Sequence, residues 1–204
     1  MPKLSVGEME NPLCNLSYYS VVLASASPRR RELLSLLGID FAVRPLEGVD
    51  ESYPHALNPI DVPLYLAEKK CRFSVPDLAE NELIITADTV VICEEKVLGK
   101  PHDWAEATAM LKMLSGRTHT VATGIAVATK ERTATSRALT EVTFAKLSKE
   151  EIDFYIDRYR PFDKAGSYGI QEWIGCIGIS HINGSFYNVM GLPLHLLYTL
   201  LRTF

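Results

Sequence analysis

The sequence has no apolar run near the roughly 20 residues that a membrane-spanning helix needs, which argues against an integral membrane protein. Residues 1–20 lack the basic start and the apolar core of a secretory signal peptide, and the four cysteines form no C-x-x-C pair. We therefore expect a cytoplasmic protein with no membrane partner. We also expect residues 1–20 to form a loosely ordered N-terminal extension.

A net positive charge is also missing, since 25 acidic residues outnumber 21 lysines and arginines and give a formal net charge of −4. Proteins that bind DNA or RNA polymers usually carry a net basic surface, and the sequence shows no aromatic platform for single-stranded RNA. The charge therefore argues against a nucleic-acid partner. It is compatible with a small anionic ligand held by a local basic cluster.

The common nucleotide and hydrolase signatures are absent as well. The sequence contains no GxxxxGK[ST] segment of a P-loop enzyme, and it contains neither GxGxxG nor GxSxG. The five histidines lack the spacing of a zinc site. These absences exclude the best-known phosphate-binding loop, dinucleotide-binding turn and serine-hydrolase elbow, and they argue against zinc.

The patterns that are present predict a mixed α/β domain. A chain of 204 residues, 47% of them hydrophobic, favours one domain with an ordinary core. Helical and strand patterns interleave, with both hairpins and crossovers, so the sheet should be mixed. The expected elements are an apolar strand near 84–92, helices that start at capping boxes 103–106 and 148–151, long antiparallel strands at 118–129 and 137–147, two short strands around Asn183-Gly184, and a closing helix from about Leu192.

Three arginines crowd the first turn of a predicted helix in the segment ASASPRRRELL. Ser27 suits the N-cap and Pro28 the first helical position, which leaves Arg29 and Arg30 in the first turn. The helix dipole makes each cation there unfavourable by roughly 0.3–1 kcal/mol, so helix propensity does not explain these arginines. A bound phosphate explains them, because backbone N–H groups, guanidinium groups and the hydroxyl of Ser25 would all face it. The alternative is a solvated basic patch paired with acids of the following loop.

Three further polar segments stand out along the chain. Asp88 follows an apolar strand, where α/β folds often place ligand chemistry, although a lone Asp at a strand end more often forms a turn or a cap. Lys100, in LGKP, is either held toward a site or simply solvated. The DKAGSYGIQ block contains Asp163, Lys164 and Gln171, and it could shape a pocket or form a tight connection.

Taken in order, these blocks resemble the Maf family of nucleoside triphosphate pyrophosphatases. The similarity runs from VVLASASPRRRELLSLLGIDF through VDES, LAEKK, ITADTVV and LGKP to DKAGSYGIQ and INGSFYNVMGLPL. It covers nearly the whole chain after residue 20, which implies a single Maf-like catalytic domain over residues 21–204. The resemblance also implies an elongated mixed β-sheet flanked by helices, with two lobes and a central cleft, as in the inosine triphosphate pyrophosphatases.

The resemblance implies hydrolysis of a nucleoside triphosphate between its α and β phosphates. Asp88 is similar in position to the family's catalytic carboxylate and Glu51 to its acidic partner, and both could hold Mg²⁺ or Mn²⁺. Lys100 is implied in catalysis as a cation near the transferring group. The implied substrate-binding residues are Ser25, Arg29, Arg30, Lys70 and Gln171. Two positions in the comparison with the family pattern stay open. Either Lys69 or Lys70 could be the expected lysine, and either Asp50 or Glu51 the expected acidic residue.

The DKAGSYGIQ block is similar to that of a subgroup that prefers dTTP, UTP and modified pyrimidine triphosphates. Gln171 could read a pyrimidine edge with its paired donor and acceptor. The alternative function is a nucleotide-binding regulator of cell division without significant turnover, which would need the cations but not Asp88 and Glu51. The expected assembly is a homodimer, because twofold oligomers are the commonest.

Overall fold

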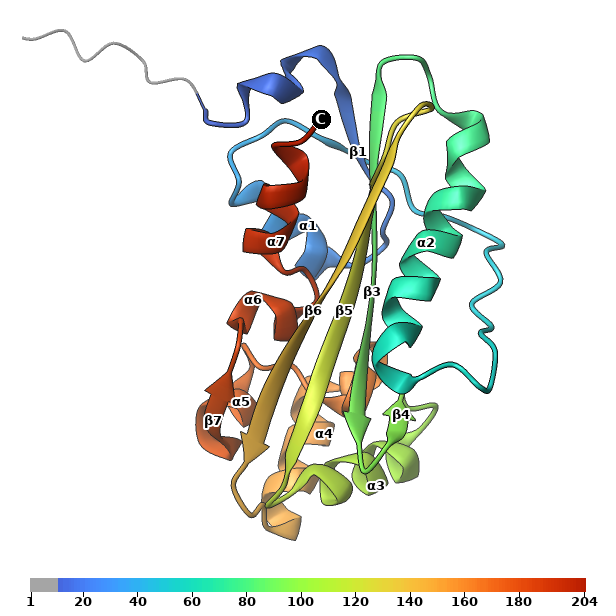
Figure 1. The fold of residues 1–204 in the computed structure, drawn as a ribbon. Helices are drawn as coiled ribbons and strands as arrows, with labels where there is room; N and C mark the ends of the chain where they lie inside the picture. Colours follow the sequence, from blue (N-terminus) through green and yellow to red (C-terminus); the bar gives the residue numbers. More distant parts are fainter. Residues whose placement is uncertain (1–10) are drawn as a thin grey trace, which may run out of the picture.

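The computed structural model describes residues 11–204 and is organised around one long central strand, β3 (Glu82–Cys93). The sheet runs the length of an elongated molecule, with helices on both faces (Figure 1). Its strand order is β2-β1-β3-β5-β6-β7, with β4 paired to β3. β1 is parallel to β2 and β3 and all other pairs are antiparallel, which confirms the predicted mixed sheet. The other strands are β1 (Ser20–Leu23), β2 (Ala42–Val43), β4 (Lys96–Leu98), β5 (Thr118–Ala128), β6 (Thr133–Phe144) and β7 (Ile179–Asn183).

Within the described part of the chain, one α-helix, α2 (Val62–Ser74), covers one face of the sheet and packs on alanine and glycine residues of β5. A Cβ atom at Gly124 would lie only 2.3 Å from the Cα of Leu64, so only glycine admits the helix backbone at this point. The Thr86 hydroxyl of β3 donates to the Ala67 carbonyl of α2 over 2.8 Å. This close packing fixes the position of α2 above the centre of β3.

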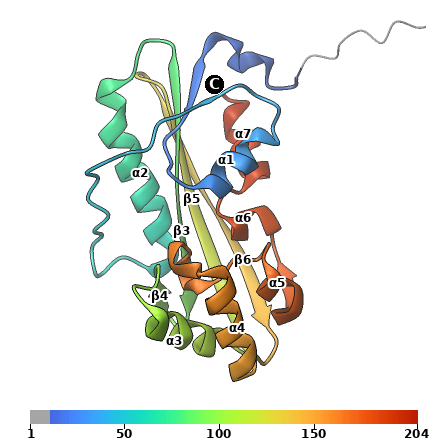
Figure 2. The same ribbon diagram turned by 180° about the vertical axis from the view of Figure 1, so that it is seen from behind.

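Two groups of helices with separate hydrophobic cores cover the opposite face (Figure 2). One core joins α1 and α7 to Ile125 and Val127 of β5, and the other joins α3 and α4 to Val121. Thr123 lies between them on the same strand, and its hydroxyl is 3.0 Å from that of Thr89 on β3. The two lobes therefore meet at a polar seam. The helices here are α1 (Pro28–Ser35), α3 (Trp104–Leu114), α4 (Lys149–Tyr159), α5 (Trp173–Gly178), α6 (Phe186–Met190) and α7 (Leu194–Leu201).

The starts of α1, α3 and α4 follow the predicted N-caps, whereas one predicted strand in the C-terminal part is a helix. Side-chain oxygens of Ser27, Asp103 and Ser148 accept backbone N–H groups three residues further on, at the starts of α1, α3 and α4. The prediction of a second strand after Asn183-Gly184 is wrong. Ser185 is the N-cap of α6 there, and its hydroxyl accepts a helix N–H, which favours a helix over an extended chain.

Residues 11–19 pack against the domain, which contradicts the loosely ordered extension that we expected, while residues 1–10 lie outside the described residues. Leu13 and Leu16 are buried in the core between α1 and α7. The Asn15 side-chain amide donates to the Leu201 carbonyl over 2.8 Å. Burial of the two leucine side chains and the hydrogen bond of Asn15 both help to hold this segment against the domain.

Five 3-10 helices complete the described connections. They are Cys14–Tyr18, Pro59–Asp61, Val75–Asp77, Pro161–Asp163 and Ala165–Ser167. Among residues 11–204, no helix has both the length and the apolar character that crossing a membrane requires.

Candidate active site

A cleft opens along one edge of β3, at a gap between two neighbouring strands. β1 pairs with β3 as far as Ile85, and β4 begins its pairing at Val91. Between these points the described chain leaves residues 86–90 without a strand on this edge, because β1 ends and the chain turns into α1. The cleft has a volume of about 670 Å³ and is lined from both faces of the sheet.

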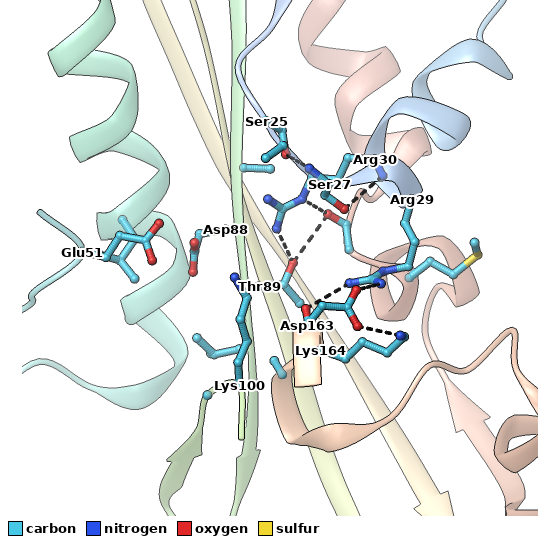
Figure 3. Close-up of a pocket in the computed structure, with 18 of the residues that line it drawn as sticks. Ser25, Ser27, Arg29, Arg30, Glu51, Asp88, Thr89, Lys100, Asp163 and Lys164 are labelled. Atoms are coloured by element: carbon cyan, nitrogen blue, oxygen red, sulfur yellow. Dashed lines mark hydrogen bonds and ion pairs between the residues drawn. The ribbon is translucent and has the colours of Figure 1, made fainter. Parts of the chain in front are cut away.

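Asp88 lies inside this gap, in the middle of β3 and not at the strand end that we expected. β5 pairs with β3 from Ile84 to Ile92, with Gly124 opposite Asp88, and this pairing keeps the strand extended. Successive side chains of a strand point to opposite faces. Asp88 therefore faces α2, while Thr89 faces the N-terminus of α1 (Figure 3).

Lys70 joins two carboxylates on the α2 side of the cleft. Its Nζ lies 2.6 Å from Asp88 Oδ1 and 2.9 Å from Glu51 Oε1. Partial burial raises the pKa of Glu51, but the hydrogen bond from Lys70 and the charges of Lys100 and Arg30 outweigh it. The pKa of Glu51 therefore lies below its usual value of 4.5, and the side chain is an anion at neutral pH.

The sequence neighbours Lys69 and Asp50 form a separate ion pair outside the cleft, with Nζ 2.7 Å from Oδ2. Hydrogen bonds from Lys69 and Ser52 hold the pKa of Asp50 well below its usual value. Neither Lys69 nor Asp50 lines the cleft, whereas Lys70 and Glu51 both do. The structure thus brings Lys70 and Glu51, and not their neighbours, next to Asp88.

The N-terminus of α1 forms the wall on the other face of β3. Ser25 Oγ accepts the Ser27 N–H over 3.2 Å and shapes the turn that leads from β1 into α1. Arg30 donates through Nε to the Gly191 carbonyl at 2.8 Å and through Nη2 to Thr89 Oγ1 at 3.1 Å. Burial lowers the pKa of this guanidinium from its usual value of 12.5. Two acceptors from separate elements therefore fix Arg30 beside the gap.

Arg29 reaches across the cleft to the second lobe (Figure 3). Its Nη1 donates to Asp163 Oδ2 at 2.7 Å, and Asp163 Oδ1 accepts from Lys164 Nζ at 2.7 Å. Partial burial raises the pKa of Asp163, but the hydrogen bonds from Lys164 and Arg29 outweigh it and keep the pKa below its usual value. One carboxylate therefore holds two cations from opposite lobes. The third arginine, Arg31, is exposed.

Lys100 and Gln171 complete the lining, and both are exposed to the cleft. No other described residue forms a hydrogen bond or an ion pair with the Lys100 ammonium group. The Gly166 N–H donates to the Gly99 carbonyl over 3.0 Å, which places the loop of Lys100 beside the DKAGSYGIQ block. All residues inferred from the sequence thus line one cleft, namely Ser25, Arg29, Arg30, Glu51, Lys70, Asp88, Lys100 and Gln171.

Three residues of the cleft received no role from the sequence. Thr89 interrupts an apolar strand directly after Asp88, and this polar pair is the signal that could have found it. Asp163 and Lys164 belong to the DKAGSYGIQ block, of which only Gln171 was assigned a function. Their contribution depends on Arg29, which lies more than a hundred residues earlier in the chain, so local sequence reasoning could not pair them.

Basic residues outnumber acidic ones in the cleft, although the whole chain is acidic. The excess amounts to two positive charges, from five basic and three acidic side chains. A concave site with a positive excess attracts polyanions. The basic residues are Arg29, Arg30, Lys70, Lys100 and Lys164, and the acidic ones are Glu51, Asp88 and Asp163.

Comparison with known proteins decides the family. Residues 20–204 match the family model described as Maf-like protein. The chain belongs to the Maf-like protein family. It is 53% identical to the dTTP/UTP pyrophosphatase of Parabacteroides distasonis, over 93% of this chain and 98% of that protein. It is 54% identical to the dTTP/UTP pyrophosphatase of Porphyromonas gingivalis, over 94% and 98% of the two chains.

The Maf-like chain also shares its fold with a more distant solved structure, the Ham1 protein of Staphylococcus aureus. The TM-score is 0.55 at 15% sequence identity, over 90% of this chain and 98% of that one. This likeness concerns the fold alone. It confirms the expected architecture of an elongated mixed sheet with helices on both faces.

Proposed function

We propose that this chain hydrolyses dTTP and UTP between the α and β phosphates and releases a nucleoside monophosphate and pyrophosphate. The observation that carries the proposal is Asp88, held by Lys70 beside Glu51 inside a cleft with a positive excess. A pure nucleotide binder needs the cations but not the carboxylates. The names of the relatives at about half identity support the same reaction.

The cations of the cleft would bind the triphosphate. Arg29 and Arg30 lie in the first turn of α1, where the helix dipole and free N–H groups favour a phosphate. Arg30 is already fixed by Gly191 and Thr89, whereas Arg29 would exchange Asp163 for a phosphate oxygen. Lys100 has no competing partner among the described residues and is free to neutralise charge on the departing pyrophosphate.

Asp88 would act as the base of the reaction. It accepts a proton from water, the water oxygen bonds to phosphorus, and the anhydride bond between the α and β phosphates breaks. Lys70 orients the Asp88 carboxylate through the 2.6 Å contact, and Glu51 shares the same ammonium group. Because no strand of the described chain pairs with residues 86–90 on this edge of β3, water and phosphate can reach the Asp88 side chain through the gap.

The residues present fit a divalent ion that arrives with the substrate. The described residues contain no cluster of three or more His, Cys, Asp or Glu side chains that could hold a metal by themselves. Mg²⁺ is commonly held by one or two carboxylates together with phosphate oxygens and water. Asp88 and Glu51 would supply those carboxylates, and Mg²⁺ or Mn²⁺ would withdraw charge from the phosphates.

Gln171 would read the base. Its carboxamide carries one acceptor and one donor group, which match the N3–H and a carbonyl of uracil or thymine. We also propose a cytoplasmic protein without nucleic-acid or membrane partners that forms a homodimer, and sedimentation of the purified chain tests the dimer.

The test is a panel of triphosphates with purified protein and Mg²⁺ or Mn²⁺, with pyrophosphate and orthophosphate measured separately. We expect pyrophosphate from dTTP and UTP. Asp88→Asn should lower kcat by 10²–10⁴-fold without raising KM, since it removes a negative charge near an anion. Asp50→Asn, a carboxylate next in sequence to Glu51 but outside the cleft, should leave both parameters unchanged.

Other outcomes would contradict the proposal in distinct ways. Release of orthophosphate alone would place the attack on the terminal phosphate. Turnover by Asp88→Asn at the rate of the unaltered chain would refute the role of Asp88. Binding of triphosphates without any product would favour the nucleotide-binding regulator.

A further inference from the structure

Gln171 is carried by a tight turn that has an unusual support. The Glu172 N–H donates to the Gly169 carbonyl over 3.0 Å, which closes a four-residue turn with Gln171 at its third position. A Cβ atom at Gly169 would lie 3.0 Å from Gln171 Nε2 and 3.0 Å from Glu172 Oε2. The carboxamide of Gln171 and the carboxylate of Glu172 therefore both lie against the Gly169 Cα, and a side chain there would displace them.

One buried phenol holds both ends of this turn. Tyr155 of α4 is fully buried, and its hydroxyl accepts the Gly169 N–H over 3.0 Å. The same hydroxyl donates to Glu172 Oε2. Burial raises the pKa of Tyr155, and the neighbouring Glu172 raises it further, so the phenol remains a donor.

The second oxygen of Glu172 is also occupied. Glu172 Oε1 lies 3.1 Å from Lys164 Nζ, and Lys164 is itself buried and bound to Asp163. A buried ion pair rarely stabilises a fold more than apolar residues of the same volume would. The contribution of this network therefore lies in the position of the chain that it holds. It holds the turn that carries Gln171 on both sides.

The orientation of a glutamine carboxamide decides which pyrimidine it accepts. Uracil and thymine present a donor at N3 and a carbonyl at position 4, whereas cytosine presents an acceptor at N3 and an amino donor at position 4. A carboxamide that can turn by 180° matches either pattern, because its donor and acceptor exchange places. The negative charge of Glu172 beside it favours the nitrogen, and not the oxygen, on the Glu172 side.

We propose that Tyr155 and Glu172 are positioning residues that hold the Gln171 carboxamide in one orientation and so select uracil and thymine over cytosine. The inference rests on the proposed function, in which Gln171 reads the base. Tyr155 fixes the backbone of the turn, and Glu172 fixes the direction of the carboxamide. Neither residue lines the cleft itself.

The experiment compares Tyr155→Phe and Glu172→Gln with the unaltered chain. We expect the ratio of kcat/KM for UTP to that for CTP to fall roughly tenfold in each variant, as a lost hydrogen bond implies, through a higher KM for UTP with little change in kcat. The matched control is Tyr159→Phe. Tyr159 stacks on Tyr155 in the same helix with ring centroids 5.2 Å apart, and its hydroxyl bonds to no described residue, so this variant should keep the ratio.

The two hypotheses fail in different measurements. If the unaltered chain hydrolyses no pyrimidine triphosphate, the proposed function is refuted, and the inference with it. If it hydrolyses UTP but both variants, folded by circular dichroism, keep its preference over CTP, the inference alone is refuted. An equal loss for UTP and CTP would likewise overturn it, because a merely structural role lowers both rates together.

Discussion

Replacing Lys70 with methionine would remove the ammonium group that Asp88 and Glu51 share while keeping a side chain of similar length. The Glu51 side chain is 60% exposed and can be hydrated after the change, whereas the Asp88 side chain is only 14% exposed. The cost in folding free energy should therefore come from Asp88. Lys69→Met is the matched control, because Lys69 pairs with Asp50, whose side chain is 68% exposed.

Two estimates set upper limits on the expected loss of stability. Removing one partner of a fully buried ion pair costs about 3–5 kcal/mol. A carboxyl group that takes up a proton to avoid being an unpaired anion costs about 4 kcal/mol at pH 7, since a model aspartate titrates near pH 3.9. The remaining exposure of Asp88 reduces both limits, so we expect about 2–3 kcal/mol for Lys70→Met. The exposed pair broken by Lys69→Met should cost about 0–1 kcal/mol.

The pH dependence separates this explanation from a simple packing defect. At pH 5 protonation of a carboxyl group costs only about 1.5 kcal/mol, so the loss in Lys70→Met should shrink as the pH falls. Urea unfolding of both variants at pH 7 and pH 5 measures this, and pyrophosphate release should fall at least ~10²-fold in Lys70→Met alone. Equal losses in the two variants, or a loss in Lys70→Met that does not change with pH, would refute the reasoning.

Three further predictions concern the scaffold of the cleft. Gly124→Ala should lower the free energy of unfolding by about 1–3 kcal/mol, as measured in urea, and should also lower turnover. The reason is that the new Cβ atom would push α2 and Lys70 away from β3. Intact activity would contradict this prediction. Burial lowers the pKa of His119 to about 4, so the free energy of unfolding should fall as the pH drops from 6.5 toward 4. His119→Gln should remove up to ~3 kcal/mol of that fall. An unchanged pH profile of stability in this variant would refute the role of His119. Leu16→Ala should cost about 2–5 kcal/mol if residues 11–19 belong to the folded unit, and a loss below about 0.5 kcal/mol would contradict the packing described.

Local patterns predicted much of the fold because their physical causes are local. Ser27, Asp103 and Ser148 cap helices through oxygens that reach only three residues along the chain, and alternation identified β5 and β6. The segment after Asn183-Gly184 was predicted wrongly as a strand, since a five-residue helix carries too few turns to show a helical period.

The sequence by itself determined which residue types the site would use: arginines at a helix start, an aspartate next to an apolar strand, and a glycine-rich polar block. Only the tertiary structure decided between Lys69 and Lys70, because the rotation of α2 above Gly124 sets which side chain faces β3. It also decided between Asp50 and Glu51, because Glu51 contacts Lys70 in the cleft whereas Asp50 pairs with Lys69 outside it. It also decided that Asp88 is accessible, since this depends on where β1 ends and β4 begins beside β3. Contacts such as Arg29 to Asp163 join distant segments, and no local pattern records them.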